Sequence, residues 1–422
     1  MNMHKLLLFC SMLCLGLGIR LSYYLQTPFG RRVHDLNGHI EYVRYVMDHA
    51  TIPPSNGGFE FYQPPLFYFI AAIFTRIVKA FGVSTGEAVS TFVPLITLAC
   101  ALAAFVFAAL VGTRLFRLQS EVNWRIAFVY FMAVFPGLVF MGGKGVNNDC
   151  LLLLLSYMFF WQLTCFWQTG KGSYWRAGLI TMAASVLAKG NGILSIPTGF
   201  ICLFLKSDYR LSLKIRRFMQ GVFWLLVSCG WYFLFRIVFD HQTELCGNVS
   251  WLNDPPSVRW SAFEFSPLAV LITPFNHVWE KIPSFILQPE RFWEFLFRSA
   301  FFGEWWFEFD LLGSATELLA MVLLLYALYG ILFEIRQKHI FWPGLVTLVV
   351  QVLGIWLYRI RLGYFSAINN FRYIPVVLMP IIYYTFVGIR ATSGGVRYVG
   401  IICLCAFGVC CFWDVVLVAS VR

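Results

Sequence analysis

The chain has 422 residues, of which 59% are hydrophobic, 18% aromatic and only 13% charged, and its formal net charge is +11. A mean hydropathy of +0.71 excludes an ordinary soluble domain. The Lys and Arg residues are dispersed among apolar segments, so nucleic acid is excluded as the expected partner. Their excess fits either the positive-inside bias of membrane proteins or an anionic lipid or phosphate ligand.

Apolar runs of about 20 residues recur along the chain, and each can cross roughly 30 Å of hydrocarbon as a helix. Only helices and closed barrels satisfy their backbone hydrogen bonds in lipid. The sequence therefore predicts an all-α polytopic membrane protein, organised as a single membrane-embedded domain over residues 1–422. We expect eleven spans at about 5–25, 90–112, 126–141, 150–168, 177–188, 191–205, 218–238, 313–333, 340–357, 373–389 and 398–419.

The first run lacks a clear small-residue cleavage site, so we interpret it as a membrane helix rather than a signal peptide. Most of the twelve cysteines lie inside apolar runs, where they act as small hydrophobic residues. None has zinc-type spacing in a polar loop, so neither a metal site nor a disulfide framework is expected.

Lys and Arg density sets the orientation of a membrane protein. If the N-terminus is inside, the inner connections hold the basic segment 206–217 and only three acids, Glu121, Asp208 and Glu334. Functional residues are then expected on the outer face. The outer segments are 26–89 and 239–312, which are large, and 142–149 and 358–372, which are short.

Two short helices are expected in the first outer segment. In "HDLNGHIEYVRYVMDH" (34–49), Asp35, His39 and Tyr42 have the spacing of one helix face, and the apolar Val43 and Val46 can lie against the membrane surface. The following "PPLFYFIAAIFTRIVKAFG" opens on two prolines, which suit a helix start. If it spanned the membrane, every later loop would invert, so we expect it to lie in the interface with its aromatic side down.

Several motifs, in this order, resemble polyprenyl-phosphate-dependent glycosyltransferases of the GT-C fold, in the branch of protein O-mannosyltransferases and bacterial aminoarabinose transferases. These motifs are "HDLNGHIEYVRYV", "FYQPPLFYFIAAIF", "GGKGVNNDCLLLLL", "ASVLAKGNGILSIP" and "NNFRYIPVVLMP". The resemblance implies about eleven membrane helices plus two juxtamembrane helices in the first outer loop. It departs from the family at Leu36 and at Tyr62–Gln63, where many relatives have acids, so contacts made there to phosphate or metal are open here.

The resemblance implies inverting transfer of a hexose or pentose from polyprenyl phosphate to a hydroxyl acceptor on a glycolipid, polysaccharide or protein. The phosphate leaving group is already a stable anion, whereas the hydroxyl needs a general base to take its proton. We expect Asp35 to be that base. The alternative role for Asp35 is capping of the helix that follows it.

A second acid, Asp149, is expected to orient the acceptor or bind sugar hydroxyls, unless it caps the span that begins at Cys150. His39 can hydrogen-bond Asp35 one turn away, unless it is simply an interfacial polar residue. His34, Asp35 and His39 could suggest a metal, but no further close ligand is evident, so no metal or other cofactor is predicted.

Cations are needed to hold the departing phosphate, and Arg does so with two parallel hydrogen bonds. The expected substrate-binding residues are His39, Tyr62, Gln63, Lys144, Lys189, Arg372 and Tyr373, with Glu304 of "FFGEWW" as a weaker candidate. For Lys144 the alternative is snorkelling to the interface. The aromatic segment 239–312 can form an interfacial belt, the acceptor site or a lid.

Two other classes of function remain open. One is a secondary transporter or flippase of a lipid-linked or anionic substrate, although no half-to-half repeat is evident. The other is a non-catalytic subunit that presents lipid to an enzyme. The expected location is a bacterial inner membrane, with the N-terminus cytoplasmic and the site on the periplasmic or extracellular face.

Overall fold

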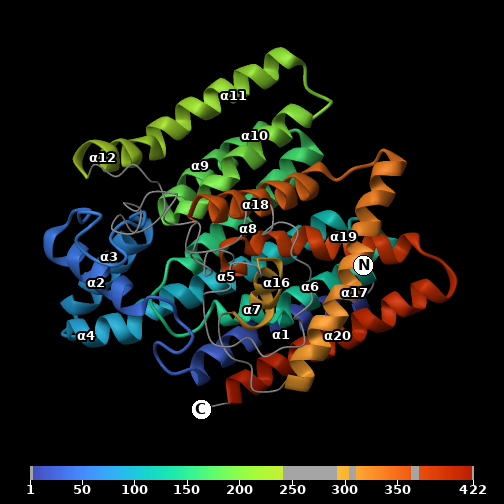
Figure 1. Ribbon diagram of the computed structural model, residues 1–422, viewed down its shortest axis with the longest axis horizontal. Helices are drawn as coiled ribbons and strands as arrows, with labels where there is room; N and C mark the ends of the chain where they lie inside the picture. Colours follow the sequence, from blue (N-terminus) through green and yellow to red (C-terminus); the bar gives the residue numbers. More distant parts are fainter. Residues whose placement is uncertain (1–2, 241–291, 304–309, 363–369, 421–422) are drawn as a thin grey trace. The chain divides into compact units, whose positions relative to one another are not determined.

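The computed structural model describes residues 3–240, 292–303, 310–362 and 370–420, and all regular structure in these ranges is helical (Figure 1). The α-helices are α1 Met3–Gln26, α2 Leu36–His49, α3 Leu66–Ala80, α4 Thr85–Glu87, α5 Val93–Leu115, α6 Val122–Val134, α7 Pro136–Phe140, α8 Asp149–Thr169, α9 Gly172–Ala188, α10 Ser195–Leu205, α11 Leu211–Leu225, α12 Trp231–Phe239, α16 Phe292–Phe302, α17 Asp310–Gln337, α18 Trp342–Leu362, α19 Leu378–Ala391 and α20 Gly394–Ser420.

Six described segments are long and apolar enough to cross a membrane: α1, the continuous α4–α5 and α11–α12, α8, α17 and α20. Shorter apolar helices cover the expected spans at 191–205, 340–357 and 373–389, and helices α6, α7 and α9 lie at the other two. The predicted all-α polytopic fold, with α2 and α3 as the two helices of the first loop, is therefore confirmed. The chain is an integral membrane protein.

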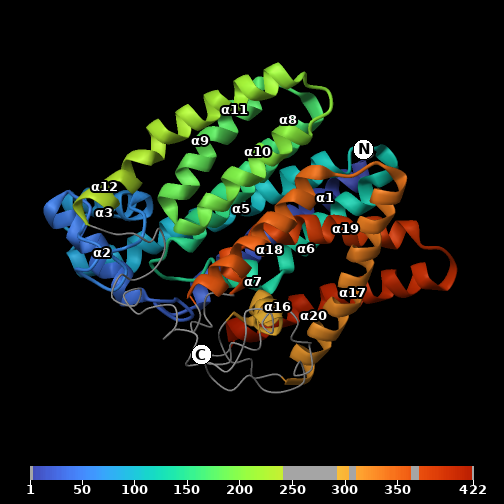
Figure 2. The same ribbon diagram turned by 45° about the horizontal axis from the view of Figure 1, so that its top comes forward.

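The helices pack into two compact units. Unit 1 comprises Met1–Gln26, Ala108–Met141 and Pro256–Arg422, and unit 2 comprises Thr27–Phe107 and Gly142–Pro255. Within unit 2, α8, α9, α10 and α11 lie side by side in two views, and α2 and α3 lie beside α12 (Figures 1 and 2). Unit 2 thus carries the two loops in which the sequence places Asp35 and Asp149.

In unit 1, a proline breaks the span that the sequence predicts as continuous over 126–141. Pro136 has no N–H, so the carbonyl of Met132 loses its helical hydrogen-bond donor. The backbone leaves the helical conformation at Phe135 and becomes extended there (φ −63°, ψ 117°). The buried Arg20 side chain of α1 donates to that carbonyl at 2.8 Å and to the Ala133 carbonyl at 3.1 Å. Arg20 therefore replaces the hydrogen bond that the proline removes.

α17 and α19 of unit 1 approach closely through two glycines. A Cβ atom at Gly330 would lie 2.1 Å from the Tyr384 carbonyl oxygen, and one at Gly388 would lie 1.9 Å from that of Tyr326. Only glycine permits this backbone contact, which is a common device for packing helices in lipid.

α3 shows a different surface from the one expected. Phe67, Tyr68 and Ala71 are buried within the protein, while Ile70, Ile73 and Ile77 are exposed. The expectation of an aromatic side facing the membrane is therefore wrong. The Tyr68 ring stacks on Tyr42 of α2, and aliphatic side chains form the outward apolar stripe.

Candidate functional site

The segment that carries Asp35 is fastened to the loop that carries Asp149. The Gly30 N–H donates to the Lys144 carbonyl at 2.9 Å. Val33 covers Gly145 so closely that a Cβ there would lie 2.2 Å from the Val33 side chain. Thr97 of α5 donates its hydroxyl to the Gly145 carbonyl at 3.0 Å. Two loops that are distant in sequence are thus held together within unit 2.

Asp35 immediately precedes α2 and adopts a left-handed conformation, with φ 54° and ψ 28°. This region is uncommon for residues other than glycine, although Asp and Asn tolerate it best. The carboxylate is exposed and makes no capping hydrogen bond to α2. The structure therefore does not support the capping alternative. It also removes Asp35 from the helical face that the sequence spacing assigned to it.

His39 lies on the buried face of α2, but its side-chain partner is not Asp35. Its Nδ1 is 2.7 Å from the hydroxyl of Tyr68 on α3. The Tyr68 ring stacks on Tyr42, with centroids 3.7 Å apart and planes 8° from parallel. In place of the His39–Asp35 hydrogen bond that the sequence spacing would allow, His39 forms a bond that joins α2 to α3.

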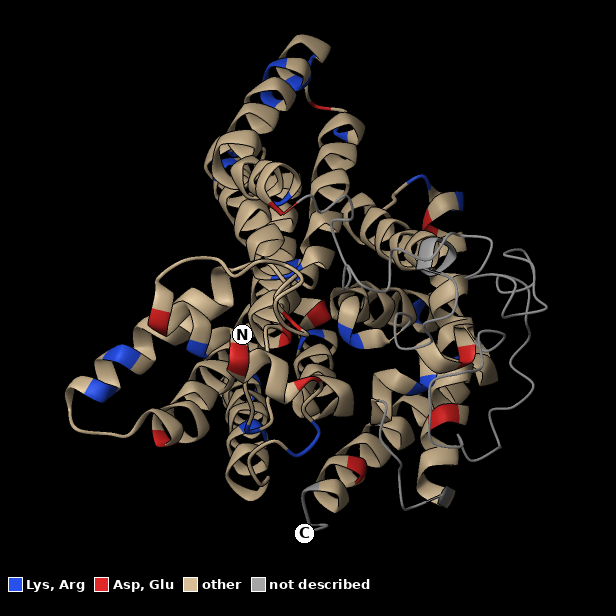
Figure 3. Ribbon diagram, turned by 60° about the vertical axis from the view of Figure 1, so that its left-hand side comes forward, with Lys and Arg blue, Asp and Glu red and all other residues tan. Residues whose placement is uncertain are grey.

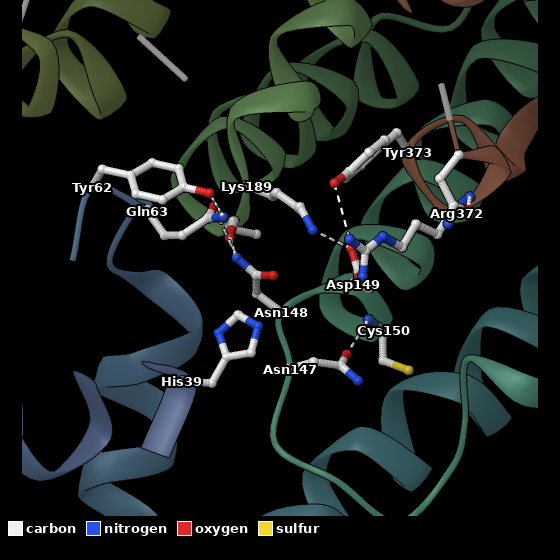
Figure 4. Close-up of polar contacts among 12 residues, drawn as sticks. His39, Tyr62, Gln63, Asn147, Asn148, Asp149, Cys150, Lys189, Arg372 and Tyr373 are labelled. Atoms are coloured by element: carbon white, nitrogen blue, oxygen red, sulfur yellow. Dashed lines mark hydrogen bonds and ion pairs between the residues drawn. The ribbon is translucent and has the colours of Figure 1, made fainter. Parts of the chain in front are cut away.

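Asp149 is the first residue of α8, and its carboxylate pairs with the ammonium of Lys189 (Figure 4). The two side chains are only 8% and 7% exposed. The capping alternative for Asp149 is wrong, because the Asn147 side chain accepts the Cys150 N–H at 3.4 Å. Asn147 thereby leaves the neighbouring carboxylate to form the ion pair.

Lys189 reaches Asp149 because the chain leaves the helix at this residue. Its backbone is extended (φ −160°, ψ 146°) at the end of α9. The chain then folds back so tightly that a Cβ at Gly192 would lie 2.1 Å from the Ser185 carbonyl oxygen. The sequence "KGNG" thus encodes a break that turns the lysine side chain toward the start of α8.

Tyr62 and Gln63 extend the same polar cluster (Figure 4). Asn148 donates its amide to the Gln63 side-chain oxygen at 3.3 Å and to the Ala188 carbonyl at 3.2 Å. Gln63 in turn donates to the Tyr62 hydroxyl at 3.1 Å. The connection before α3, the start of α8 and the end of α9 therefore meet at one place.

Two residues of this region were not singled out from the sequence. Glu60 is only 2% exposed, and its side chain lies over Gly38 of α2, where a Cβ would come within 2.7 Å of it. Burial, with the nearby Glu60 charge as the next cause, raises the pKa of Tyr68 well above its usual range. Tyr68 therefore remains a neutral hydroxyl beside His39. A glutamate in a turn-rich loop carries no local signal of burial.

The other is Arg236 of α12, which holds the loop before α3. Its guanidinium donates to the carbonyls of Pro53 at 2.8 Å and Phe61 at 2.6 Å, and it pairs with Asp240. Arg236 is 3% exposed. An arginine inside an apolar run was the available signal, since such residues are costly in lipid and usually have a specific partner.

Lys144 is half-buried in the second loop, where its carbonyl receives the Gly30 N–H. Arg372 and Tyr373 belong to unit 1. The Asn370 side chain accepts the Arg372 N–H at 3.0 Å, and the Arg372 guanidinium donates to the Tyr373 hydroxyl at 3.0 Å. Glu304 and most of the segment 239–312 lie outside the described residues. Within the described ranges, no three His, Cys, Asp or Glu side chains gather in a way that could hold a metal ion.

Unit 1 also contains an apolar cavity of about 240 Å³. Phe131 and Phe135 of α6 and its end, Phe297 and Phe301 of α16, and Phe371 beside Arg372 contribute to its lining. Such a surface suits hydrocarbon rather than a polar ligand.

This chain has the GT-C fold of membrane glycosyltransferases. No protein-family model and no curated protein matches its sequence. The oligosaccharyltransferase of Archaeoglobus fulgidus, in complex with zinc and sulfate, matches with a TM-score of 0.56, 12% identity and coverage of 97% of this chain and 53% of that one. ArnT from Cupriavidus metallidurans, bound to undecaprenyl phosphate, matches with a TM-score of 0.53 and 14% identity. This match covers 95% of this chain and 63% of the ArnT chain.

A third match, the oligosaccharyltransferase AglB of Archaeoglobus fulgidus with an inhibitory peptide and a dolichol-phosphate, has a TM-score of 0.51, 11% identity and coverage of 99% of this chain and 56% of that one. The chain thus spans less than two thirds of the length of these structures. At such identities the similarity establishes the fold, and the activity is argued separately below.

Proposed function

We propose that the chain is an inverting glycosyltransferase that moves a sugar from polyprenyl phosphate to a hydroxyl acceptor, with Asp35 as the general base. The GT-C fold supports the class of enzyme. Two of the matching structures hold a lipid phosphate, undecaprenyl phosphate in ArnT and dolichol-phosphate in AglB, which supports the class of donor. The proposed location is the outer face of a bacterial inner membrane.

The observation that carries the proposal is the left-handed backbone and the exposed carboxylate of Asp35. A non-glycine residue held in a left-handed conformation is strained, and such residues concentrate at functional sites. Its carboxylate makes no capping bond and is exposed, and the segment that precedes it is fastened through Gly30 to the loop that carries Asp149. A general base must reach the proton that it removes, and this placement meets that requirement.

The reaction proceeds by attack of the acceptor oxygen on the anomeric carbon as the bond to the phosphate oxygen breaks. Asp35 takes the hydroxyl proton, and polyprenyl phosphate leaves as an anion. Attack from the face opposite the leaving group inverts the anomeric configuration. Because the leaving group needs no proton and no Lewis acid, the proposed reaction requires no metal.

We assign the polar cluster to the sugar and the cations to the phosphate. Tyr62 and Gln63 supply hydroxyl and amide groups for sugar hydroxyls, beside the Asp149–Lys189 pair that keeps the start of α8 fixed. Lys144 is the proposed phosphate ligand of unit 2. The aromatic cavity next to Arg372 has the chemistry to hold part of an isoprenoid chain.

The test uses the full chain in liposomes with a radiolabelled polyprenyl-phosphate sugar and an envelope extract as the source of acceptors. Asp35→Asn retains a residue that tolerates the left-handed backbone but removes the base, and the rate of label transfer should fall by about 100-fold or more. Asp48→Asn is the matched control, because Asp48 is an exposed aspartate in the last turn of α2, the helix that Asp35 precedes.

A rate for Asp35→Asn within threefold of the unchanged protein, in the assay where Asp48→Asn is fully active, would refute the assignment. Transport of labelled lipid or solute across the vesicles, without any glycosylated product, would instead support the transporter.

A further inference from the structure

Seven Lys and Arg residues gather at the two turns that join α8 to α9 and α10 to α11, in unit 2 (Figure 3). They are Lys171, Arg176, Lys206, Arg210, Lys214, Arg216 and Arg217, which we call the basic surface. The single acid in segments 169–176 and 205–217 is Asp208. The surface is therefore strongly cationic by itself.

Specific contacts hold the two turns together. The Lys206 ammonium donates to the Trp167 carbonyl near the end of α8 at 2.7 Å, and the Tyr209 hydroxyl donates to the Gly170 carbonyl. Arg217 of α11 donates to the Tyr209 hydroxyl at 2.6 Å, with its guanidinium 4.5 Å from the ring centroid. These contacts join the two turns of the basic surface to each other.

The seven cations divide into two groups. Three cations make contacts within the protein. Lys206 and Lys214 donate to carbonyls in the last turns of α8 and α10, where cations are favoured. Arg217 donates to the Tyr209 hydroxyl. The other four are exposed. They are Lys171, Arg176, Arg210 and Arg216. Four positive charges therefore face outward in addition to those that the fold employs.

Exposed apolar side chains continue directly from these charges along α11. Leu211, Ile215 and Met219, four residues apart and so on one helix face, are 64%, 48% and 58% exposed. A cationic rim that passes into an apolar stripe has the chemistry of the boundary between lipid headgroups and hydrocarbon. α8 has 21 residues, so its two ends, Asp149 and the basic surface, are about 30 Å apart, roughly one hydrocarbon thickness.

We propose that the basic surface binds the headgroups of anionic phospholipids, in the leaflet opposite the polar cluster at the start of α8. Arg210 and Arg216 offer planar guanidinium groups for bidentate phosphate contacts, and Lys171 and Arg176 add charge from the neighbouring turn. The apolar stripe of α11 lies where the acyl chains of such lipids would be. A free phosphate ion would use the cations but gain nothing from that stripe.

The experiment places the full chain in nanodiscs of phosphatidylcholine with one fifth phosphatidylglycerol and counts the lipids that stay bound after extraction into detergent, by native mass spectrometry. The variant is Arg210→Gln/Arg216→Gln. The matched control is Arg44→Gln/Lys79→Gln, which removes two exposed cations of α2 and α3. Two interfacial cations should change the preference for phosphatidylglycerol about 30-fold, and the control should not change it.

Equal loss in the variant and the control, or no enrichment of phosphatidylglycerol by the unchanged protein, overturns the proposal. Displacement of the lipid by millimolar inorganic phosphate also overturns it, because it would identify a simple anion site. Matched unfolding temperatures confirm that the exposed substitutions leave the fold intact. None of these readouts depends on sugar transfer.

Discussion

Lys189 and Asp149 form a buried ion pair whose loss should be costly in a way that a double-mutant cycle can isolate. Both side chains are less than one tenth exposed. Removing one partner of such a pair takes the opposite charge of the pair away from the buried charge that stays, which destabilises a protein by about 3–5 kcal/mol. We therefore expect Lys189→Met to lower the free energy of unfolding by that amount, which is roughly a 150- to 5,000-fold change in the unfolding equilibrium.

Asp149→Asn should be costly for the same reason, because it leaves the Lys189 charge buried. The double variant Asp149→Asn/Lys189→Met removes both charges of the pair, so it should be more stable than the sum of the two losses predicts, by about 2 kcal/mol or more. The measurement is reversible unfolding of the purified chain by SDS titration in mixed micelles.

The control is a second Lys–Asp pair of unit 2, Lys206–Asp208, in which the aspartate side chain is 72% exposed. Asp208→Asn should change stability little, because water already solvates that carboxylate and Lys206 keeps its hydrogen bond to the Trp167 carbonyl. If the losses at 149 and 189 add independently, or if Lys189→Met costs no more than Asp208→Asn, the assignment of a tight buried pair is wrong.

Four further predictions concern single features. Gly192→Ala should lower the free energy of unfolding by about 2–3 kcal/mol, because the added methyl group meets a backbone carbonyl. Gly18→Ala, in open space on α1, should leave that free energy unchanged or raise it. Thermal unfolding of both variants checks this. Tyr68→Phe should lower the free energy of unfolding by about 1–3 kcal/mol, because it removes the hydroxyl that bonds the buried imidazole of His39, and an unchanged unfolding temperature would contradict it. Arg236→Met should release the loop before α3 and speed its cleavage in limited proteolysis, and equal cleavage rates would show that the arginine does not hold it. EDTA should leave the transfer rate unchanged, and a loss that Mg²⁺ or Mn²⁺ restores would refute the metal-free reaction.

The membrane helices could be predicted because their signal is local. A run of about 20 apolar residues is visible without any knowledge of its neighbours, and the two prolines before α3 mark a helix start in the same way. Helix ends were less accurate: α9 begins at Gly172 rather than at 177, because polar residues near its start weaken the apolar signal. The break at Phe135 follows from Pro136, but nothing nearby indicates that Arg20 compensates for it.

The residues of the candidate site were easier to predict than their partners. Asp149 and Lys189 both belong to predicted motifs, yet their pairing joins positions that are 40 residues apart. His39 was assigned to Asp35 by helical spacing, but the left-handed backbone at Asp35 breaks that spacing and Tyr68 takes its place. Glu60 has no motif, and its burial results only from the packing of its loop over Gly38. Long-range packing therefore decides what local patterns leave open.

Two requirements limit the choice of amino acid at position 35: the left-handed backbone and the need for a proton acceptor. Asn or Gly would maintain the turn but offer no proton acceptor of useful strength, and Glu would supply a carboxylate without the preference for this backbone that Asp and Asn share. Of these four residues, aspartate meets both demands best. A library of all substitutions at position 35 should therefore separate into variants that fold without turning over and variants that fold poorly, with no functional replacement between them.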